Sequence, residues 1–158
     1  QAKAAARAAV RRAQRRGRAA LADSTDVLVL DDSEIALRYL CKLLGDFGFR
    51  VHPARDGQAA WALCERQRFA AAFVDMRLDA DDAVDGIAIC QQLKGRPPDD
   101  VRGAARVLLV SGSGQPADEV RARLAGCDAF LAKPLTRGSV ARALDDCGVA
   151  LPADARRG

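Results

Sequence analysis

The stretch Val27-Leu28-Val29-Leu30-Asp31-Asp32-Ser33 decides the fold of this chain. Four aliphatic residues in a row, with polar residues on both sides, are typical of a strand that is buried on both faces. Two adjacent carboxylates at the end of such a strand repel each other unless a cation lies between them. Taken alone, the pair is explained equally well by one acid that caps a helix and another that faces solvent.

Length and composition indicate a globular domain. The chain has 158 residues, of which 49% are hydrophobic and 29% charged, enough for one domain with a buried core. No apolar run reaches the roughly 18 residues that a membrane-spanning helix needs, and no signal-peptide pattern is present. We therefore expect no insertion into a membrane.

The cysteines and the histidine favour a cytoplasmic protein without zinc. The five cysteines are widely spaced and form no C-x-x-C motif, which favours reduced thiols over a disulfide framework. His52 is the single histidine, so clustered zinc ligands are lacking. We expect His52 to be a strand residue without chemistry.

The positive charge of the chain is concentrated in an N-terminal arm. Residues 1–25 contain seven basic residues and one acid, whereas residues 26–158 contain 18 of the 25 basic and 20 of the 21 acidic residues. The arm is rich in Ala, Arg and Gln, which are strong helix formers, but it lacks a bulky apolar stripe. We expect a solvated helical arm or linker, and contact with nucleic acid through its arginines is the alternative.

Strand-like and helix-like patterns alternate along the rest of the chain. Further strands are expected at residues 49–53, 69–74, 107–110 and 129–132, and helices at 33–48, around 60–64, around 87–93, at 115–124 and after residue 136. This alternation predicts a parallel sheet with helices on both faces and right-handed crossovers. The carboxyl ends of all the strands then share one edge, which is where sites form in such sheets.

Five polar side chains follow the strands and should meet at that edge. They are Asp31, Asp32, Asp75, Ser111 and Lys133. The set suits phosphoryl transfer: carboxylates can hold Mg²⁺, one carboxylate can act as the nucleophile, and the hydroxyl and ammonium groups can neutralise charge on phosphoryl oxygens.

The order of these residues along the chain resembles the receiver domain of bacterial two-component response regulators, over about residues 26–148. The resemblance implies a flavodoxin-like (βα)5 three-layer sandwich with a five-stranded parallel sheet of order 2-1-3-4-5, here with an N-terminal helical extension. Residues 149–158 would form a loose C-terminal tail.

The resemblance also implies the roles of the carboxylates. Asp75 would be the phosphoacceptor and would take a phosphoryl group from a histidine kinase or a histidine phosphotransfer protein. Asp31, Asp32 and Asp75 would hold Mg²⁺ together with the backbone carbonyl of Arg77.

The remaining site residues would transmit and tune the signal. By resemblance, Lys133 and Ser111 contact the phosphoryl group, and the Lys133–Pro134 bond is cis. Phosphorylation would draw Ser111 inward and let Phe130 turn, which changes the face made by the fourth helix, the fifth strand and the fifth helix. A second copy of the chain could pair through this face. Arg77 and Ser113 would set the rate of dephosphorylation, with the long Arg77 side chain shielding the acyl phosphate.

One segment departs from the family pattern. Leu78 is followed by the acidic stretch 79–85, where a proline is usual, and Gly86 comes about three residues late. We expect a solvated loop, and the alternative is that its carboxylates strengthen the attraction of Mg²⁺ or contact the basic arm.

Other functions fit the residues less well. A phosphatase of the haloacid dehalogenase type needs D-x-D after its first strand, and Gly112-Ser113-Gly114 lacks the third glycine of a dinucleotide-binding loop. We expect a phosphorylation-activated receiver that is not an enzyme beyond its own phosphorylation and dephosphorylation; a stand-alone or degenerate receiver that docks proteins is the alternative. The non-Met start and the arm favour the C-terminal receiver of a larger or hybrid signalling protein.

Overall fold

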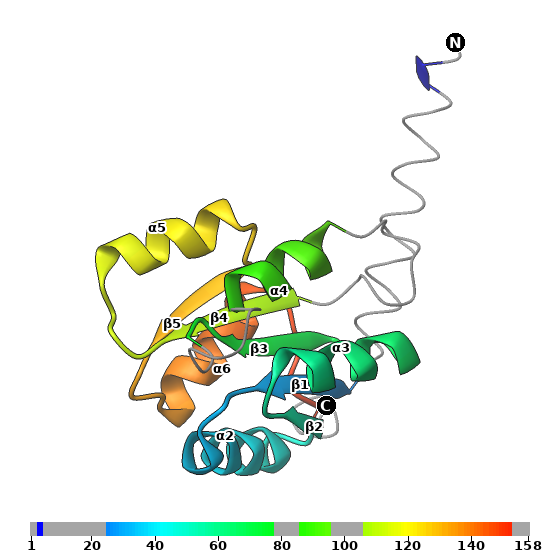
Figure 1. The fold of residues 1–158 in the computed structure, drawn as a ribbon. Coiled ribbons are helices and arrows are strands. Elements are labelled where there is room, and N and C mark those ends of the chain that lie inside the picture. The colour runs from blue at the N-terminus through cyan, green and yellow to red at the C-terminus, as the bar shows by residue number, and fades with distance from the viewer. Residues whose placement is uncertain (1–2, 5–24, 78–85, 96–105, 153–158) are drawn as a thin grey trace.

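The computed structural model describes residues 3–4, 25–77, 86–95 and 106–152 (Figure 1). Its five described strands are β1 (Asp26–Leu30), β2 (Arg50–Ala54), β3 (Ala71–Asp75), β4 (Arg106–Ser111) and β5 (Ala129–Ala132). They alternate with α2 (Glu34–Asp46), α3 (Gly57–Arg66), α4 (Gly86–Lys94), α5 (Pro116–Leu124) and α6 (Arg137–Asp146). All strand pairs are parallel and the order is β2-β1-β3-β4-β5, which confirms the expected flavodoxin-like fold.

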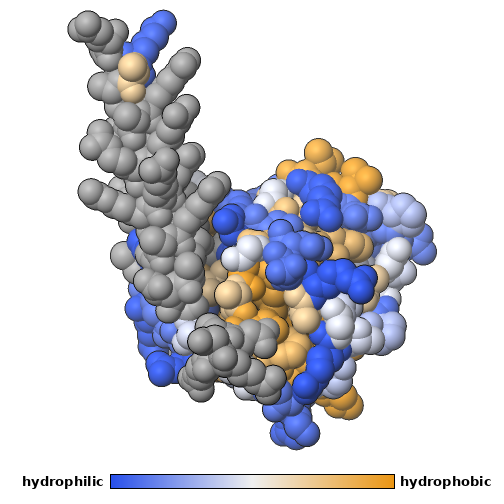
Figure 2. All heavy atoms as spheres, turned by 180° about the vertical axis from the view of Figure 1, so that it is seen from behind, coloured by the Kyte–Doolittle hydropathy of each residue, from blue (hydrophilic) through white to orange (hydrophobic). Residues whose placement is uncertain are grey.

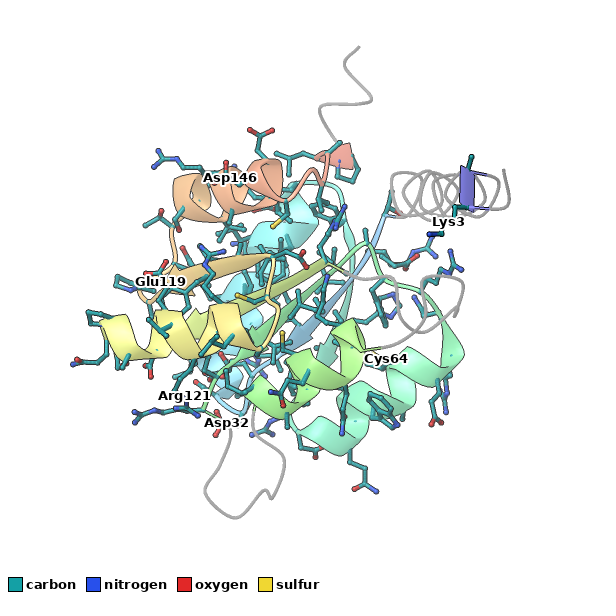
Figure 3. The ribbon with its side chains drawn as sticks, turned by 90° about the horizontal axis from the view of Figure 1, so that it is seen from above. Lys3, Asp32, Cys64, Glu119, Arg121 and Asp146 are labelled. Atoms are coloured by element: carbon teal, nitrogen blue, oxygen red, sulfur yellow. The ribbon has the colours of Figure 1, made fainter. Side chains whose placement is uncertain are left out.

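The sheet is covered on both faces. Alternate residues of β1 enter different cores: Leu28 and Leu30 belong to a cluster with residues of α3, α4 and α5, whereas Val27 and Val29 belong to a cluster with residues of α2 and α6. Figure 3 shows α6 on one side of the sheet and α3, α4 and α5 on the other. This arrangement explains why β1, β3 and β4 are nearly continuous apolar runs.

Side-chain caps fix where three helices begin. Ser33, directly after the two acids, accepts a hydrogen bond from the amide of Ala36, and Asp56 accepts one from the amide of Ala59. Thr136 and Ser139 form a reciprocal capping box at the start of α6. Caps of this kind satisfy amide groups that the first helical turn leaves without partners. The helices expected from residue 33 and after residue 136 therefore begin where they were predicted, whereas α3 begins at Gly57, earlier than the expected range around 60–64.

Gly86 brings the start of α4 against the end of β3. A Cβ atom at this position would lie 2.0 Å from the carbonyl oxygen of Asp75 and 2.9 Å from the Cα atom of Met76. No side chain larger than hydrogen fits there, because both neighbours are backbone atoms. The glycine that arrives late in the sequence therefore serves the close contact between α4 and the strand that carries Asp75.

Several expectations fall outside the described residues. Of the N-terminal arm, Lys3, Ala4 and Thr25 are described, the first two as helical, whereas the acidic stretch 79–85 and residues 96–105 are not described. Within the described ranges, no helix combines the length and the hydropathy that crossing a bilayer requires.

Part of the expected loose tail packs against the core. Val149 and Leu151 contact the cluster beneath α2 and α6, and Pro152 is buried. Burial of these apolar side chains stabilises the packed position of this part of the tail.

Candidate functional site

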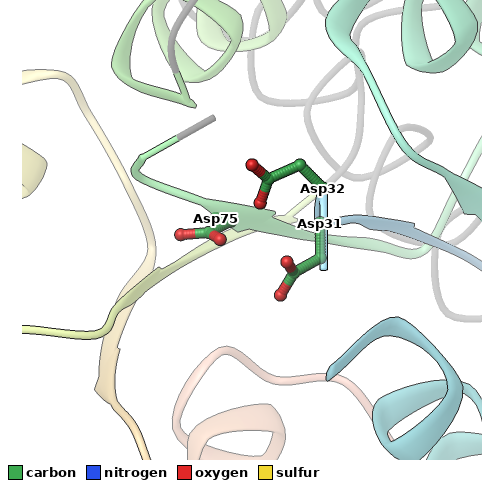
Figure 4. A group of neighbouring side chains, drawn as sticks. All are labelled: Asp31, Asp32 and Asp75. Carbon is green, nitrogen blue, oxygen red and sulfur yellow. The ribbon is translucent and has the colours of Figure 1, made fainter. Parts of the chain in front are cut away.

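Three carboxylates meet where β1 and β3 end. Leu30 of β1 pairs with Val74 of β3, so that Asp31, Asp32 and Asp75 all follow at the same edge of the sheet (Figure 4). One carboxylate oxygen from each lies within 4.8 Å of the other two; Asp31 and Asp75 are buried and Asp32 is exposed. This spacing and oxygen chemistry fit a hard divalent cation with six or more oxygen ligands, of which water would supply the rest.

Lys133 is the cation that the structure places beside these carboxylates. Its Nζ lies 3.2 Å from Oδ2 of Asp31 and 3.5 Å from Oδ2 of Asp75. The position follows from β5, because Ala132 pairs with Ser111 and the amide of Lys133 donates to the carbonyl of Ser111. Burial works against the charged ammonium, but the carboxylates of Asp75 and Asp31 outweigh it and raise the pKa of Lys133. The Lys133–Pro134 peptide bond is cis, as expected.

Asp75 is the most perturbed carboxyl group of the site. Its side chain is 8% exposed, and this burial raises the pKa of Asp75 to about 6. The negative charge of Asp31 adds to the rise, whereas the amide of Arg77, which donates to Oδ1 at 3.1 Å, and the charge of Lys133 oppose it. The folded protein therefore holds more negative charge at this edge than Lys133 alone can stabilise, which is the electrostatic condition that favours binding of a further cation.

Ser111 lies at the end of β4 and bonds away from Asp75. Its side-chain oxygen accepts from the amides of Ser113 and Gly114, and its hydroxyl donates to Oδ2 of Asp118 at 2.9 Å. The hydroxyl of Ser113 donates to the same oxygen of Asp118. Asp118 is 7% exposed, and hydrogen bonds from Ser113 and Ser111 lower its pKa.

The structure brings together most of the expected site, with one difference. Asp31, Asp32, Asp75 and Lys133 converge. The hydroxyl of Ser111 is committed to Asp118, a residue that sequence reasoning missed. An acid in the first turn of a helix is common because of the helix dipole, so the sequence offered no signal that this acid is buried.

Two further predicted residues lie nearby. Arg77 is exposed, and its guanidinium is close enough to Asp118 to contribute to the low pKa of that carboxyl. Phe130 on β5 is half-buried and packs against the cluster beneath α3, α4 and α5.

A groove opens beside the carboxylates, between α2 and the segment after β5. It encloses about 850 Å³, and its walls include Ile35, Tyr39, Leu135 and Asp75. Tyr39 spans the groove by donating to the carbonyl of Leu135 at 2.9 Å. Ile35, one of the residues that line the groove, is 84% exposed.

Comparison with known proteins identifies the family. The model of the response regulator receiver domain matches residues 27–145. The chain is 31% identical over 135 residues to the sensor histidine kinase AruS of Pseudomonas aeruginosa and 30% identical over 132 residues to the photosynthetic apparatus regulatory protein RegA of Rhodovulum sulfidophilum. These alignments cover 85% and 84% of this chain but 13% of AruS and 68% of RegA. The chain belongs to the response regulator receiver domain family.

Solved structures show the same fold. A response regulator protein from Burkholderia pseudomallei, with a phosphorylated aspartic acid, a calcium ion and citrate, superimposes with a TM-score of 0.67 at 28% identity, covering 86% of this chain and 74% of that one. The receiver domain of a Pseudomonas aeruginosa sensor histidine kinase, with a magnesium ion in its active site cleft, gives 0.67 at 23% identity, covering 79% and 98%. This second likeness shows the fold alone. The chain is thus a receiver domain of two-component systems, a signalling module of a family in which phosphorylation and Mg²⁺ are typical.

Proposed function

We propose that this chain accepts a phosphoryl group on Asp75 from a phosphohistidine of a histidine kinase or phosphotransfer domain. The observation that carries the proposal is the position of Asp75: a buried carboxylate at the end of the central strand, between a cationic Lys133 and two further carboxylates. A carboxylate oxygen would attack phosphorus, and the P–O bond would form as the P–N bond breaks, with its electron pair left on the imidazole nitrogen.

The other residues of the site would support this transfer. Asp31, Asp32 and Asp75, with the backbone carbonyl of Arg77, would hold Mg²⁺, which supplies positive charge near the phosphoryl oxygens. Lys133 would contact one phosphoryl oxygen directly, because its ammonium group already lies within reach of Asp75. Arg77 and Ser113 would flank the acyl phosphate and set the rate at which water reaches it.

Phosphorylation would change the conformation of the face formed by α5, β5 and α6. Ser111 would turn toward the new phosphoryl oxygens, and Phe130 would fill the vacated space. A partner protein or a second copy of the chain would read this face. The location would be the cytoplasm, consistent with five reduced thiols, and the domain would act as a module of a longer signalling protein.

Titration with beryllofluoride and Mg²⁺, or with acetyl phosphate and Mg²⁺, tests the proposal. We expect the wild-type chain to respond, as followed by NMR shifts or by a phosphate-affinity gel, and we expect Asp75→Asn and chelation of Mg²⁺ to abolish the response. Asp145→Asn, the same chemical change on the exposed surface of α6, is the matched control and should respond like wild type. A wild-type chain that stays silent would instead support a degenerate receiver that docks proteins.

A further inference from the structure

The switch hydroxyl of Ser111 is already fully hydrogen-bonded in this structure. Its oxygen accepts from two backbone amides and lies 3.1 Å from the hydroxyl oxygen of Ser113, and the hydroxyl donates to Oδ2 of Asp118 at 2.9 Å. A serine hydroxyl has a single proton to donate. The same is true of Ser113, whose proton is directed to the same carboxylate oxygen.

Asp118 is well suited to hold these two protons. It lies in the first turn of α5, where the helix dipole stabilises a negative charge, and it is 7% exposed. An ionised carboxylate can only accept hydrogen bonds, and bonds to a charged acceptor are stronger than bonds between neutral groups. Water therefore competes poorly for the hydroxyl of Ser111.

A phosphoryl group on Asp75 would need the same proton. Phosphoryl oxygens, like carboxylate oxygens, are acceptors, so Ser111 can donate to Asp118 or to the phosphoryl group but not to both. We propose that Asp118 is a positioning residue that holds Ser111 and Ser113 in the unphosphorylated arrangement and so sets how readily the domain switches. This inference rests on the proposed role of Asp75.

The contact also links the site to the proposed output face. Asp118 belongs to α5, and Val120 and Leu124 of the same helix are 58% and 82% exposed. When Ser111 turns toward a phosphoryl group, the hydrogen bond between Ser111 at the end of β4 and Asp118 in the first turn of α5 is lost. The loss frees this turn to shift, so that a change at Asp75 alters the helix that a partner would contact.

The experiment compares Asp118→Ala with wild type in titrations with beryllofluoride and Mg²⁺. Loss of the competing acceptor should lower the half-saturating concentration about threefold to tenfold. Glu119→Ala is the matched control: it removes one acid from the next position of α5 (labelled in Figure 3), where the carboxylate pairs with Arg123 at the surface. Its half-saturating concentration should equal that of wild type. If Asp118 only stabilised the fold, Asp118→Ala would raise the half-saturating concentration of beryllofluoride instead of lowering it.

A double-mutant cycle with Ser111→Ala isolates the pathway. If Asp118 acts through the hydroxyl of Ser111, then Asp118→Ala changes the half-saturating concentration in the wild-type background and leaves it unchanged in the Ser111→Ala background. An equal effect in both backgrounds, or none in the first, overturns the inference while the function of Asp75 stands. If Asp118→Ala unfolds, Asp118→Asn takes its place in the test. This substitution keeps the shape of the side chain but weakens the acceptor, so it should lower the half-saturating concentration by less than the alanine substitution would. A wild-type chain that does not bind beryllofluoride at all removes both proposals.

Discussion

Asp75 is a buried carboxyl group, and burial without a bound cation disfavours its negatively charged form. Because its folded pKa of about 6 lies above the ordinary value, the folded state favours the protonated form. The contribution of this group to stability is therefore greatest below about pH 4, where it is protonated in both states, and is lost as the pH rises through about 6.

Replacement of Asp75 tests this effect of burial. In a chelating buffer, Asp75→Asn should raise the free energy of unfolding by about 1–3 kcal/mol at pH 8, and the gain should disappear near pH 4. Chemical denaturation at several pH values measures it, with Asp145→Asn as a control that should show no such pH dependence. A variant less stable than wild type at pH 8 would contradict this effect of burial. Added Mg²⁺ should stabilise wild type and not Asp75→Asn.

At the scale of single elements, two glycines in helices have opposite roles. Gly86 begins α4 in contact with the backbone of β3, whereas Gly45 lies inside α2 with no atom within 4 Å of the place where a Cβ would be. Gly86→Ala should destabilise the domain by about 2–4 kcal/mol because backbone atoms must move. Gly45→Ala should stabilise it by about 0.5–1 kcal/mol, because alanine loses less backbone entropy in a helix. Thermal or urea unfolding measures both changes. Similar effects of the two substitutions would contradict the conclusion that Gly86, unlike Gly45, is required by a close backbone contact.

Strands and helix starts of this fold could be predicted from the sequence where residues close together in the chain determine them. The strand β1 and the start of the next helix near residue 33 follow from neighbouring residues, and the structure contains both. The strand order was not derivable from spacing and came from the family resemblance. The partner of Ser111 could not be predicted either, because Asp118 reaches it only after α5 folds back over the end of β4. Contacts between elements depend on packing, which a linear pattern does not encode.

At the scale of the whole molecule, the large hydrophobic side chains that are exposed among the described residues fall into two groups on different helices. Ile35 and Tyr39 of α2 line the groove beside Asp75, whereas Val120 and Leu124 lie on α5. Figure 2 shows that the face seen from behind carries many hydrophilic side chains around a hydrophobic area in its middle, with a further hydrophobic area at the top. If Asp75 accepts a phosphoryl group from a phosphohistidine, the donor must approach Asp75 closely, and we expect it to dock on this groove.

The substitution Ile35→Ser distinguishes docking of a protein phosphodonor from the phosphorylation of Asp75 itself. A protein donor should lose an apolar contact at the rim of the site, so transfer from a phosphorylated histidine phosphotransfer domain that serves the wild-type chain should slow about tenfold. Phosphorylation by acetyl phosphate, which is too small to use the groove, should be unchanged. Leu124→Ser, an equally exposed aliphatic residue at 82% on α5, should leave both rates as in wild type. If Ile35→Ser slowed both donors alike, the residue would act on the site itself; if Leu124→Ser slowed the protein donor instead, docking would lie on α5.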